Sequence, residues 1–262
     1  MVTSDEKKLL ALTYAEYEGI GTWYEYLAKY RLFSRINNPK KVLLAGIPQE
    51  YGIAADTILF AIHGAELTVL DNRKEKLNEF KEIAKKFNAK VKTVLCKTLE
   101  KFPFKSDSFD IVVNTEAIQR VKNPQNMIQE MERVSKNHVF VFAPNAYYYA
   151  HYLITKIITF KLSELVKMSR LKLVNKGYLD RPPWPAGVAI SSSKISFTEG
   201  SKSEERKKYA EEKNKDSFFI SFIKGSFTLF TPLLVKLEIL YPSPLRELLS
   251  HICFIHLKKI KN

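Results

Sequence analysis

The chain has 262 residues, of which 45% are hydrophobic and 27% charged, and its formal net charge is +14. This length supports a full core, built as one domain or as one domain with a small appendage. With only Cys96 and Cys253, far apart in sequence, and no apolar run near the roughly 20 residues of a spanning helix, the composition argues against a disulfide-built or transmembrane protein. Because the first residues also lack a signal-peptide core, we expect a cytoplasmic protein.

Apolar periodicity predicts helices over residues 4–36, with a bend at Gly19 and Gly21. Short apolar runs then alternate with helical patterns. The predicted strands are 41–46, 66–71, 90–95, 108–114 and 138–143, and the predicted helices between them are 52–63, 73–87 and 123–135. Apolar strand interiors and long crossovers indicate a buried parallel sheet. The sequence therefore predicts an α/β Rossmann-like sandwich, with a mostly parallel twisted sheet, helices on both faces, N-terminal helices and a C-terminal extension.

The C-terminal part is less regular. Residues 146–161 are aromatic and then helical, 162–171 predict a helix, and 173–178 predict a late strand. Three prolines make 181–190 an expected irregular loop, because proline removes a donor and fixes φ. Residues 199–217 are polar and are expected to form either a helix or a mobile insertion. Residues 218–257 are apolar, with prolines that interrupt regular structure. We expect the apolar stretch to pack on the core; the alternatives are an acceptor channel or a membrane-surface contact.

Three segments follow from these patterns. Residues 1–38 are expected to form an N-terminal helical cap, and residues 39–180 the Rossmann-like core. Residues 181–262 would form a Pro/Trp loop and an apolar extension packed on that core.

The stretch from Lys41 to Asp71 has the layout of a strand, a tight loop, a helix and a second parallel strand. In such units the first loop holds a nucleotide-like ligand, and an acid ending the second strand bonds its ribose hydroxyls. Gly46 and Asp71 occupy those two positions. Each of these residues also has a possible role without a ligand. Asp71 would then cap the following helix, and Gly46 and Gly52 would only form turns. A nicotinamide cofactor is disfavoured, because the Gly-x-Gly-x-x-Gly loop is missing.

Several segments resemble class I S-adenosylmethionine-dependent methyltransferases of the small-molecule "type 11" kind, over about residues 40–178. KKVLLAGIPQEYG (40–52) resembles the first motif, ELTVLD (66–71) the second-strand acid, and FPFKSDSFDIVVNTEAIQRV (102–121) the block around the fourth strand. MIQEMERVSKN (127–137) resembles the helix before the fifth strand, and FAPN (142–145) the segment after it. FDIVVN is the most specific piece, because Asn123-Pro124 and the Glu-x-x-Arg-Val of residues 130–134 keep the family's spacing.

The resemblance implies methyl transfer from S-adenosylmethionine and a site for that cofactor. Asp71 would accept the ribose hydroxyls, amides near Gly52 would receive the carboxylate at a helix N-terminus, and groups near Asn114 would hold the ammonium. The predicted cofactor-binding residues are Gly46, Ile47, Pro48, Gly52, Asp71, Asn72, Thr98, Leu99, Asn114, Thr115 and Glu116.

Methyl transfer is an in-line displacement that depends chiefly on positioning, so no catalytic signature is expected. In the resembling family, the N-terminal helices and the segments after the fourth and fifth strands cover the acceptor. The candidate acceptor contacts here are Tyr17, Tyr24, Arg120 and Asn145, and Glu18, beside the Gly19 bend, is the candidate base. Aromatic residues at helical spacing equally suit plain packing, and the Pro-Pro-Trp-Pro loop suits either a lid or a partner interface. No metal site is predicted.

Departures from the family pattern favour a rival function. The first loop keeps only two glycines, Cys96-Lys97-Thr98 stands where an adenine-binding acid usually follows strand three, and Gln119-Arg120 replaces a Glu-His pair. These changes indicate a catalytically eroded binding or scaffold protein as the main alternative to a methyltransferase.

The distribution of charge bears on the partner. Residues 151–262 contain 20 Lys and Arg against 10 Asp and Glu, so most of the positive surplus lies there. Such a surplus attracts anionic lipid or nucleic acid, although scattered lysines also suit an ordinary solvated face. The hypothesis of an RNA methyltransferase is supported only by this charge, because the sequence contains no RNA-recognition motif. We therefore expect a small-molecule or lipid-like acceptor.

Overall fold

The computed structural model describes residues 3–16, 20–48, 52–149, 158–180, 188–190, 195–197 and 229–260. Two helices, α1 (Ser4–Ala15) and α2 (Ile20–Phe33), precede the sheet. Thr3 and Glu6 form a capping box that satisfies the first amides of α1. The Trp23 indole donates to the Glu6 carbonyl oxygen at 3.2 Å, so a buried aromatic side chain ties α2 to the start of α1.

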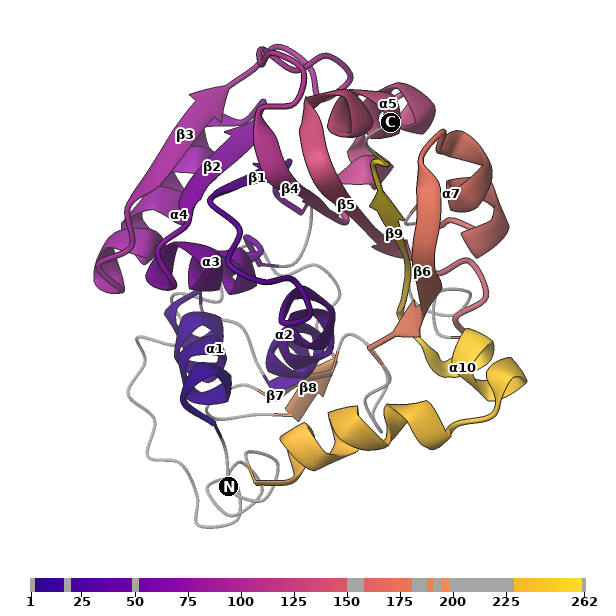
Figure 1. Cartoon of the computed structure of the whole chain (residues 1–262). Coiled ribbons are helices and arrows are strands. Elements are labelled where there is room, and N and C mark those ends of the chain that lie inside the picture. Colours follow the sequence, from indigo (N-terminus) through magenta and orange to yellow (C-terminus); the bar gives the residue numbers. More distant parts are fainter. Residues whose placement is uncertain are drawn as a thin grey trace.

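Seven strands form one sheet in the order β3-β2-β1-β4-β5-β9-β6 (Figure 1). The strands are β1 (Lys41–Ala45), β2 (Glu66–Asp71), β3 (Val91–Leu95), β4 (Phe109–Thr115), β5 (Ser135–Pro144), β6 (Lys172–Leu179) and β9 (Ile252–Lys258). The first five pair in parallel, whereas β9 runs antiparallel between β5 and β6. A separate two-stranded ribbon joins β7 (Val188–Ile190) and β8 (Ile195–Phe197).

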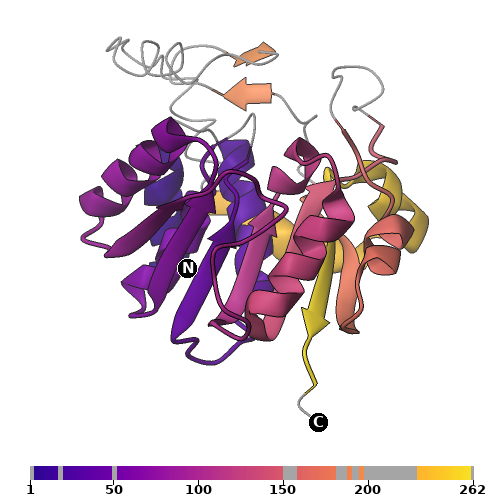
Figure 2. The same ribbon diagram turned by 90° about the horizontal axis from the view of Figure 1, so that it is seen from above.

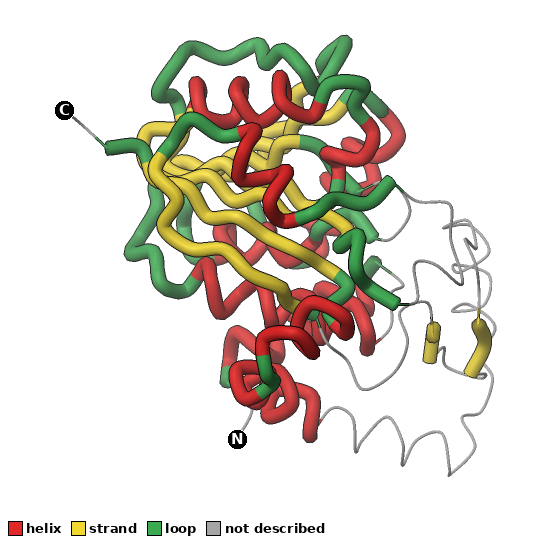
Figure 3. The backbone as a smooth tube through the Cα atoms, turned by 90° about the vertical axis from the view of Figure 1, so that its right-hand side faces the viewer, coloured by secondary structure: helices red, strands yellow, loops and turns green. Residues whose placement is uncertain are grey.

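Helices cover both faces of the sheet, as the edge-on views show (Figures 2 and 3). The remaining helices are α3 (Ile58–Ile62), α4 (Lys74–Lys86), α5 (Pro124–Val134), α7 (Leu162–Met168), a helix over residues 229–237, α10 (Ser243–Leu249), and the 3-10 turns η1 (Ala55–Thr57), η2 (Ala117–Arg120) and η3 (Glu238–Leu240). Helices α1 to α4 share one apolar cluster with the sheet, and α5 and α7 share another. Alternate residues of each central strand enter opposite clusters, because side chains alternate along a strand.

The fold confirms the predicted sandwich and its five parallel strands. Strand β5 begins earlier than expected, at Ser135, directly after α5 ends. The prediction of irregular structure throughout 181–190 was wrong at 188–190, because β7 pairs with β8 there. Strand β9 was not predicted as a strand, and it brings part of the expected C-terminal extension into the sheet itself. Residues 150–157 and 199–217 lie outside the described part of the chain.

None of the described helices combines the length and the apolar character needed to cross a membrane. Over the same described residues, no group of three or more His, Cys, Asp or Glu side chains is arranged to hold a metal ion. Both cysteines are free thiols.

Candidate functional site at the carboxyl ends of the strands

The carboxyl ends of the parallel strands meet at one edge of the sheet. The chain order reverses there, because β1 pairs with β2 on one side and with β4 on the other. Ligands of open α/β sheets bind outside the strands at such a reversal. We call Gly46, Asp71, Asn114 and Glu116, which lie at or just beyond the ends of β1, β2 and β4, the strand-end site.

Asp71 faces the bend that follows Gly46, the arrangement that the sequence predicted. The Ile47 amide donates to Asp71 Oδ2 at 2.7 Å, and Asp71 is fully buried. Gly46 adopts a φ of 84°, in the left-handed region that favours glycine. A Cβ on Gly46 would lie 2.5 Å from the Ala117 Cβ and 3.0 Å from Leu99. Packing against η2 therefore requires glycine here, independently of any ligand.

Two arginines already occupy the Asp71 carboxylate. Arg120 Nη2 lies 2.6 Å from Oδ2, and Arg73 Nε lies 3.0 Å from Oδ1. Burial alone would raise the pKa of Asp71, but the Arg73 hydrogen bond and the Arg120 charge lower it, so the carboxylate is ionised. Arg73 also donates to the carbonyl oxygens of Ile47 and Pro48, which fixes the loop after β1. Asp71 Oδ1 accepts the Arg73 amide at 2.9 Å, so the carboxylate also orders the start of α4.

The amides after Gly52 have protein partners as well. The Ile53 amide donates to Glu16 Oε2 at 2.8 Å, and the Ala55 amide donates to the Tyr26 hydroxyl at 3.0 Å. The Tyr26 hydroxyl in turn donates to Glu16. These are amides that the sequence assigned to the cofactor's carboxylate. The helix expected from residue 52 begins only with η1 at Ala55, so the segment just after Gly52 is not a helix N-terminus.

A buried cation lies at the end of β4. Lys29 is fully buried and donates to Glu25 and to the Thr115 hydroxyl, and its Nζ lies 3.9 Å from Glu116 Oε1. Its ammonium also sits 5.4 Å from the centre of the Phe142 ring. Burial opposes the charge, but the neighbouring carboxylates raise the pKa of Lys29 above its usual value. Lys29 is therefore a fixed positive charge inside the fold.

Acidic groups outnumber cations around Lys29. The inner charge cluster, as we name it, comprises Glu25, Lys29, Asp56, Glu116, Asp180 and His251, which interact electrostatically with one another. His251 Nδ1 lies 3.1 Å from Asp180 Oδ2. Both carboxylate oxygens of Asp56, Asp180 Oδ1 and the side-chain oxygen of Asn114 are buried without a hydrogen-bond partner. Such acceptors are costly to bury, so they call for a donor or a cation.

The cluster holds protons more tightly than exposed groups would. Burial raises the pKa of Asp56 to about 6 and that of Glu116 to about 7, with Glu25's negative charge adding to both shifts. Burial also raises the pKa of Asp180 to about 6. For His251, burial opposes the charged form, but the hydrogen bond that its ring donates to Asp180 raises the pKa to about 9.

We predict that the free energy of unfolding falls as pH rises from 5 to 8. Each of these four groups has a folded pKa above its unfolded value, so the folded state binds more protons and its stability is lost as pH rises through the folded pKa values. Two imidazoles act in the opposite direction, because burial lowers the pKa of His256 to about 4 and also lowers that of His138, but they are fewer than the four groups with raised pKa. Carboxylates with lowered pKa, such as Asp71, titrate below this window. The expected loss is on the order of 2–4 kcal/mol, measured by urea unfolding. Glu116→Gln should flatten the slope, and a wild-type stability that rises with pH would contradict this assignment.

The other predicted site residues are distributed as follows. Asn72 accepts Arg120 Nη1 at 3.1 Å, which brings it beside Asp71, and Leu99 is buried against Gly46. Thr98 accepts the Glu100 amide in a local turn. Asn145 is buried at the end of β5 and donates to the carbonyl oxygens of Glu247 and Ser250. Ile47, Pro48 and Tyr24 are buried, whereas Tyr17 and Glu18 lie outside the described residues. These assignments remain predictions.

Sequence reasoning missed several charged residues of this region. They are Glu16, Glu25, Lys29, Asp56, Arg73 and His251. Their partners are distant in sequence: Lys29 is 86 positions from Thr115, and Glu16 is 37 from Ile53. The available signal was local, namely a lysine on the expected apolar side of the 20–33 helix and an acid in the helix after β1.

Comparison with known proteins supports the fold and the domain. Residues 51–143 match the family model described as a methyltransferase domain. The fold is similar to the YcgJ protein from Bacillus subtilis, with a TM-score of 0.52, 14% identity, and coverage of 91% of this chain and 99% of that chain. It is also similar to a structure of the Haloferax volcanii Trm112 methyltransferase activator with its methyltransferase, with a TM-score of 0.53, 12% identity, and 90% of each chain covered. A comparison with curated protein sequences finds no match.

The match and the fold agree with the resemblance found in the sequence. Residues 51–143 match a methyltransferase-domain model, in agreement with the resemblance seen in the sequence. The cyclase SpnF is also similar in fold, with a TM-score of 0.51, 10% identity, and coverage of 85% of this chain and 75% of that chain. Since this architecture hosts a cyclase as well, the function has to be argued from the site.

Proposed function

We propose that this chain binds S-adenosylmethionine at the strand-end site and methylates a small or lipid-like acceptor. The observation that carries the proposal is the excess of buried acceptors near the carboxyl ends of the strands. Asp56, Asp180 and Asn114 keep buried oxygens without partners in a protein of net charge +14. A ligand with a sulfonium and an ammonium group matches that local charge.

The residue types fit the cofactor. Asp71 is an ionised carboxylate at the position that bonds ribose hydroxyls, once Arg120 moves off Oδ2. Asn114, held by its amide donation to the Ala45 carbonyl oxygen at 2.7 Å, keeps its side-chain oxygen for a cationic group. When bound, the cofactor supplies an electrophilic methyl group. Glu116, with a pKa raised to about 7, can hold or release the acceptor's proton near neutral pH.

An apolar surface beside this edge of the sheet supports the acceptor class. The helix over 229–237, η3 and α10 expose large apolar side chains: Leu229, Phe230, Leu233, Leu237, Leu240, Leu245 and Leu248. These elements run from α2 to the end of β6 (gold in Figure 1). Arg31 of α2 donates to the Val235 carbonyl oxygen, and the Tyr149 amide beyond β5 donates to the Leu248 carbonyl oxygen at 3.2 Å. An amphipathic acceptor suits such a surface.

Titration calorimetry with S-adenosylmethionine and with its demethylated product tests the proposal. We expect saturable binding of both at micromolar concentrations, followed by transfer of a labelled methyl group to an amphipathic acceptor in preference to a hydrophilic one. Absence of binding by either compound would overturn the proposal. Methylation of RNA in place of small acceptors would overturn the acceptor class only.

A scaffold function is the second candidate, and one observation favours it. Arg120 and Glu16 make, from within the chain, contacts that the ribose and the carboxylate of a cofactor would make. A fold that satisfies these groups itself stays closed without a ligand. The Trm112 complex shows that a related fold binds an activator protein, so a protein partner is the corresponding alternative.

We predict that Arg120→Gln tightens cofactor binding by about three- to tenfold. The wild type must break the Arg120–Asp71 contact before Asp71 Oδ2 becomes available, and a hydrogen bond between charged groups contributes about 1.5–3 kcal/mol. Calorimetric titration of both proteins measures the difference, with the exposed Arg170→Gln as the matched control. Weaker binding by Arg120→Gln would mean that Arg120 contacts the cofactor instead of excluding it.

A further inference from the structure

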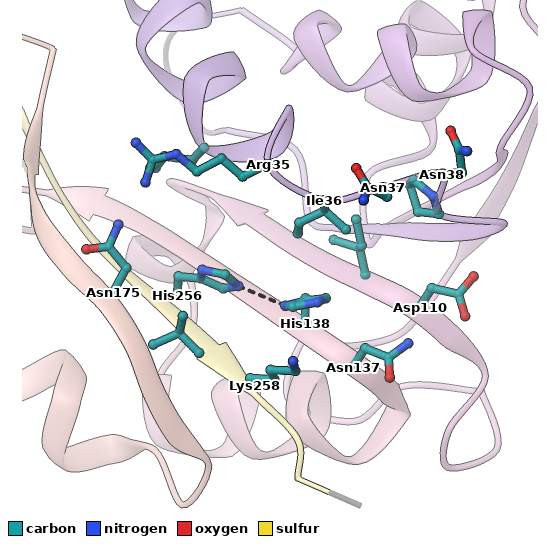
Figure 4. A pocket seen from close by; sticks show the side chains of 14 residues that line it. Arg35, Ile36, Asn37, Asn38, Asp110, Asn137, His138, Asn175, His256 and Lys258 are labelled. Carbon is teal, nitrogen blue, oxygen red and sulfur yellow. Dashed lines mark hydrogen bonds between the residues drawn. The ribbon is translucent and has the colours of Figure 1, made fainter.

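A large cavity lies at the opposite edge of the sheet from the strand-end site. It has a volume of about 820 Å³ and is lined by the residues after α2, the starts of β4 and β5, and parts of β6 and β9. Figure 4 shows His138, His256 and Asn175 on the strands and Arg35 on the helical side. No step of the proposed methyl transfer uses these residues.

The cavity is polar and its field is positive. Arg35 and Lys258 contribute cations, and Asp110 is the one carboxylate among the lining residues. Asp110 Oδ2 accepts the amides of Lys40 and Lys41 at 2.8 and 3.0 Å, and Lys136 Nζ lies 3.8 Å from Oδ1. The negative charge of Asp110 is therefore already compensated. Side-chain amides supply further donors, from Asn37, Asn38, Asn137 and Asn175.

Basic residues stand directly opposite one another across three strands. Lys258 of β9 pairs with Lys172 of β6 on one side and with His138 of β5 on the other. Like charges directly opposite each other destabilise a sheet, so this row has no stabilising role within the fold. An anion placed against it would relieve the repulsion.

The positive electrostatic field of the cavity also acts on two histidine side chains. His138 Nδ1 and His256 Nε2 are 2.9 Å apart, so one ring donates to the other and the accepting ring is neutral. Burial lowers the pKa of His256 to about 4, with the charges of His138, Lys258 and Arg35 adding to the shift. Burial and then Lys258 lower the pKa of His138. The charges that act on the two histidines are all positive. The pairing of Lys258 with Lys172 is independent evidence for an excess of positive charge here.

We propose that this cavity binds a phosphate-class oxyanion, either free phosphate or a phosphomonoester. Arg35 and Lys258 would supply charge-assisted hydrogen bonds, the asparagine amides would complete the donor set, and the imidazole pair would take up a proton as the anion enters. The inference does not depend on the proposed methyl transfer, because the two sites lie at opposite ends of the parallel strands.

Nuclear magnetic resonance of the imidazoles in the full chain tests the proposal. With inorganic phosphate we expect saturable shifts of the His138 and His256 signals and a rise of at least one unit in the pKa of His256. Sulfate, whose charge is constant over this range, should bind more tightly at pH 5.5 than at pH 8. Glycerol 3-phosphate is the monoester probe: tighter binding than phosphate identifies an ester as the ligand, and equal binding identifies the free anion.

Variants locate the binding. Lys258→Gln and Arg35→Gln should each weaken phosphate binding by about tenfold, since each removes a charged donor. The exposed Lys105→Gln, which is not among the lining residues, should leave it unchanged. Shifts that fail to saturate, or that persist equally in both cavity variants, would overturn the proposal.

Discussion

Asp71→Asn should weaken binding of S-adenosylmethionine and of its demethylated product at least tenfold. Asparagine keeps the shape of the side chain but removes the charge and replaces one acceptor oxygen by a donor. A ribose diol donates its hydroxyls to a carboxylate, and a hydrogen bond to a charged group contributes about 1.5–3 kcal/mol. Calorimetric titration at neutral pH measures the change directly. Unchanged affinity would mean that Asp71 serves only to hold the arginines.

The same substitution should also lower stability. It leaves Arg73 and Arg120 facing an uncharged amide, and Asp71 is fully buried. Removing one partner of a buried ion pair costs about 3–5 kcal/mol, and the partial exposure of Arg73 favours the lower end. Asp107→Asn is the matched control, because Asp107 is exposed and pairs with Lys259 on the surface. Affinities must therefore be measured below the unfolding temperature of the variant.

Arg120 links these two effects. The double variant Asp71→Asn with Arg120→Gln restores the net charge that Asp71, Arg73 and Arg120 have together in the wild type, so it should recover part of the lost stability without recovering affinity. Recovery of both would place the cofactor elsewhere. Recovery of neither would show that Arg73 alone sets the energy of Asp71.

Local sequence patterns predicted the parallel strands β1 to β5 better than the antiparallel strand β9 near the other side of the sheet. Strands β1 to β5 follow one another with helices or long crossovers between them, so alternating periodicity and turn residues were enough to place them. Strand β9 is inserted between β5 and β6 from more than 70 positions further along the chain. Its apolar residues suit a strand or a core helix equally well, and only the completed sheet selects between them.

The site divides in the same way. The placement of Gly46 and Asp71 could be predicted, because it follows from the strand-loop-helix-strand layout of one short segment. Arg120 was predicted as an acceptor contact, yet it lies against Asp71, 49 positions away, because η2 folds back over Gly46. Sequence spacing carries no information on which of several distant charges will meet once the strands align.

Lys29 of the inner charge cluster is where we expect the second large effect of a substitution, a loss of stability. Lys29→Met should lower the free energy of unfolding by about 3–5 kcal/mol at pH 8, because it leaves Glu25, Asp56 and Glu116 without their shared cation. The loss should be smaller at pH 5, where the raised pKa values of Asp56 and Glu116 keep both carboxyls largely protonated. Urea unfolding at the two pH values measures it, with the surface pair Lys8–Asp5 supplying the control variant Lys8→Met.

Lys29 also offers a test that separates charge from packing. S-adenosylmethionine carries a sulfonium, whereas its demethylated product has a neutral sulfur. If the inner charge cluster holds the cofactor's cationic end, Lys29→Met leaves carboxylates without a cation. The sulfonium of S-adenosylmethionine compensates these carboxylates better than the neutral sulfur of the demethylated product. The ratio of the two affinities should then shift toward S-adenosylmethionine by about threefold or more in the variant, because unpaired carboxylates attract a cation strongly at low dielectric. An unchanged ratio would remove the cluster from the cofactor site while leaving its role in stability intact.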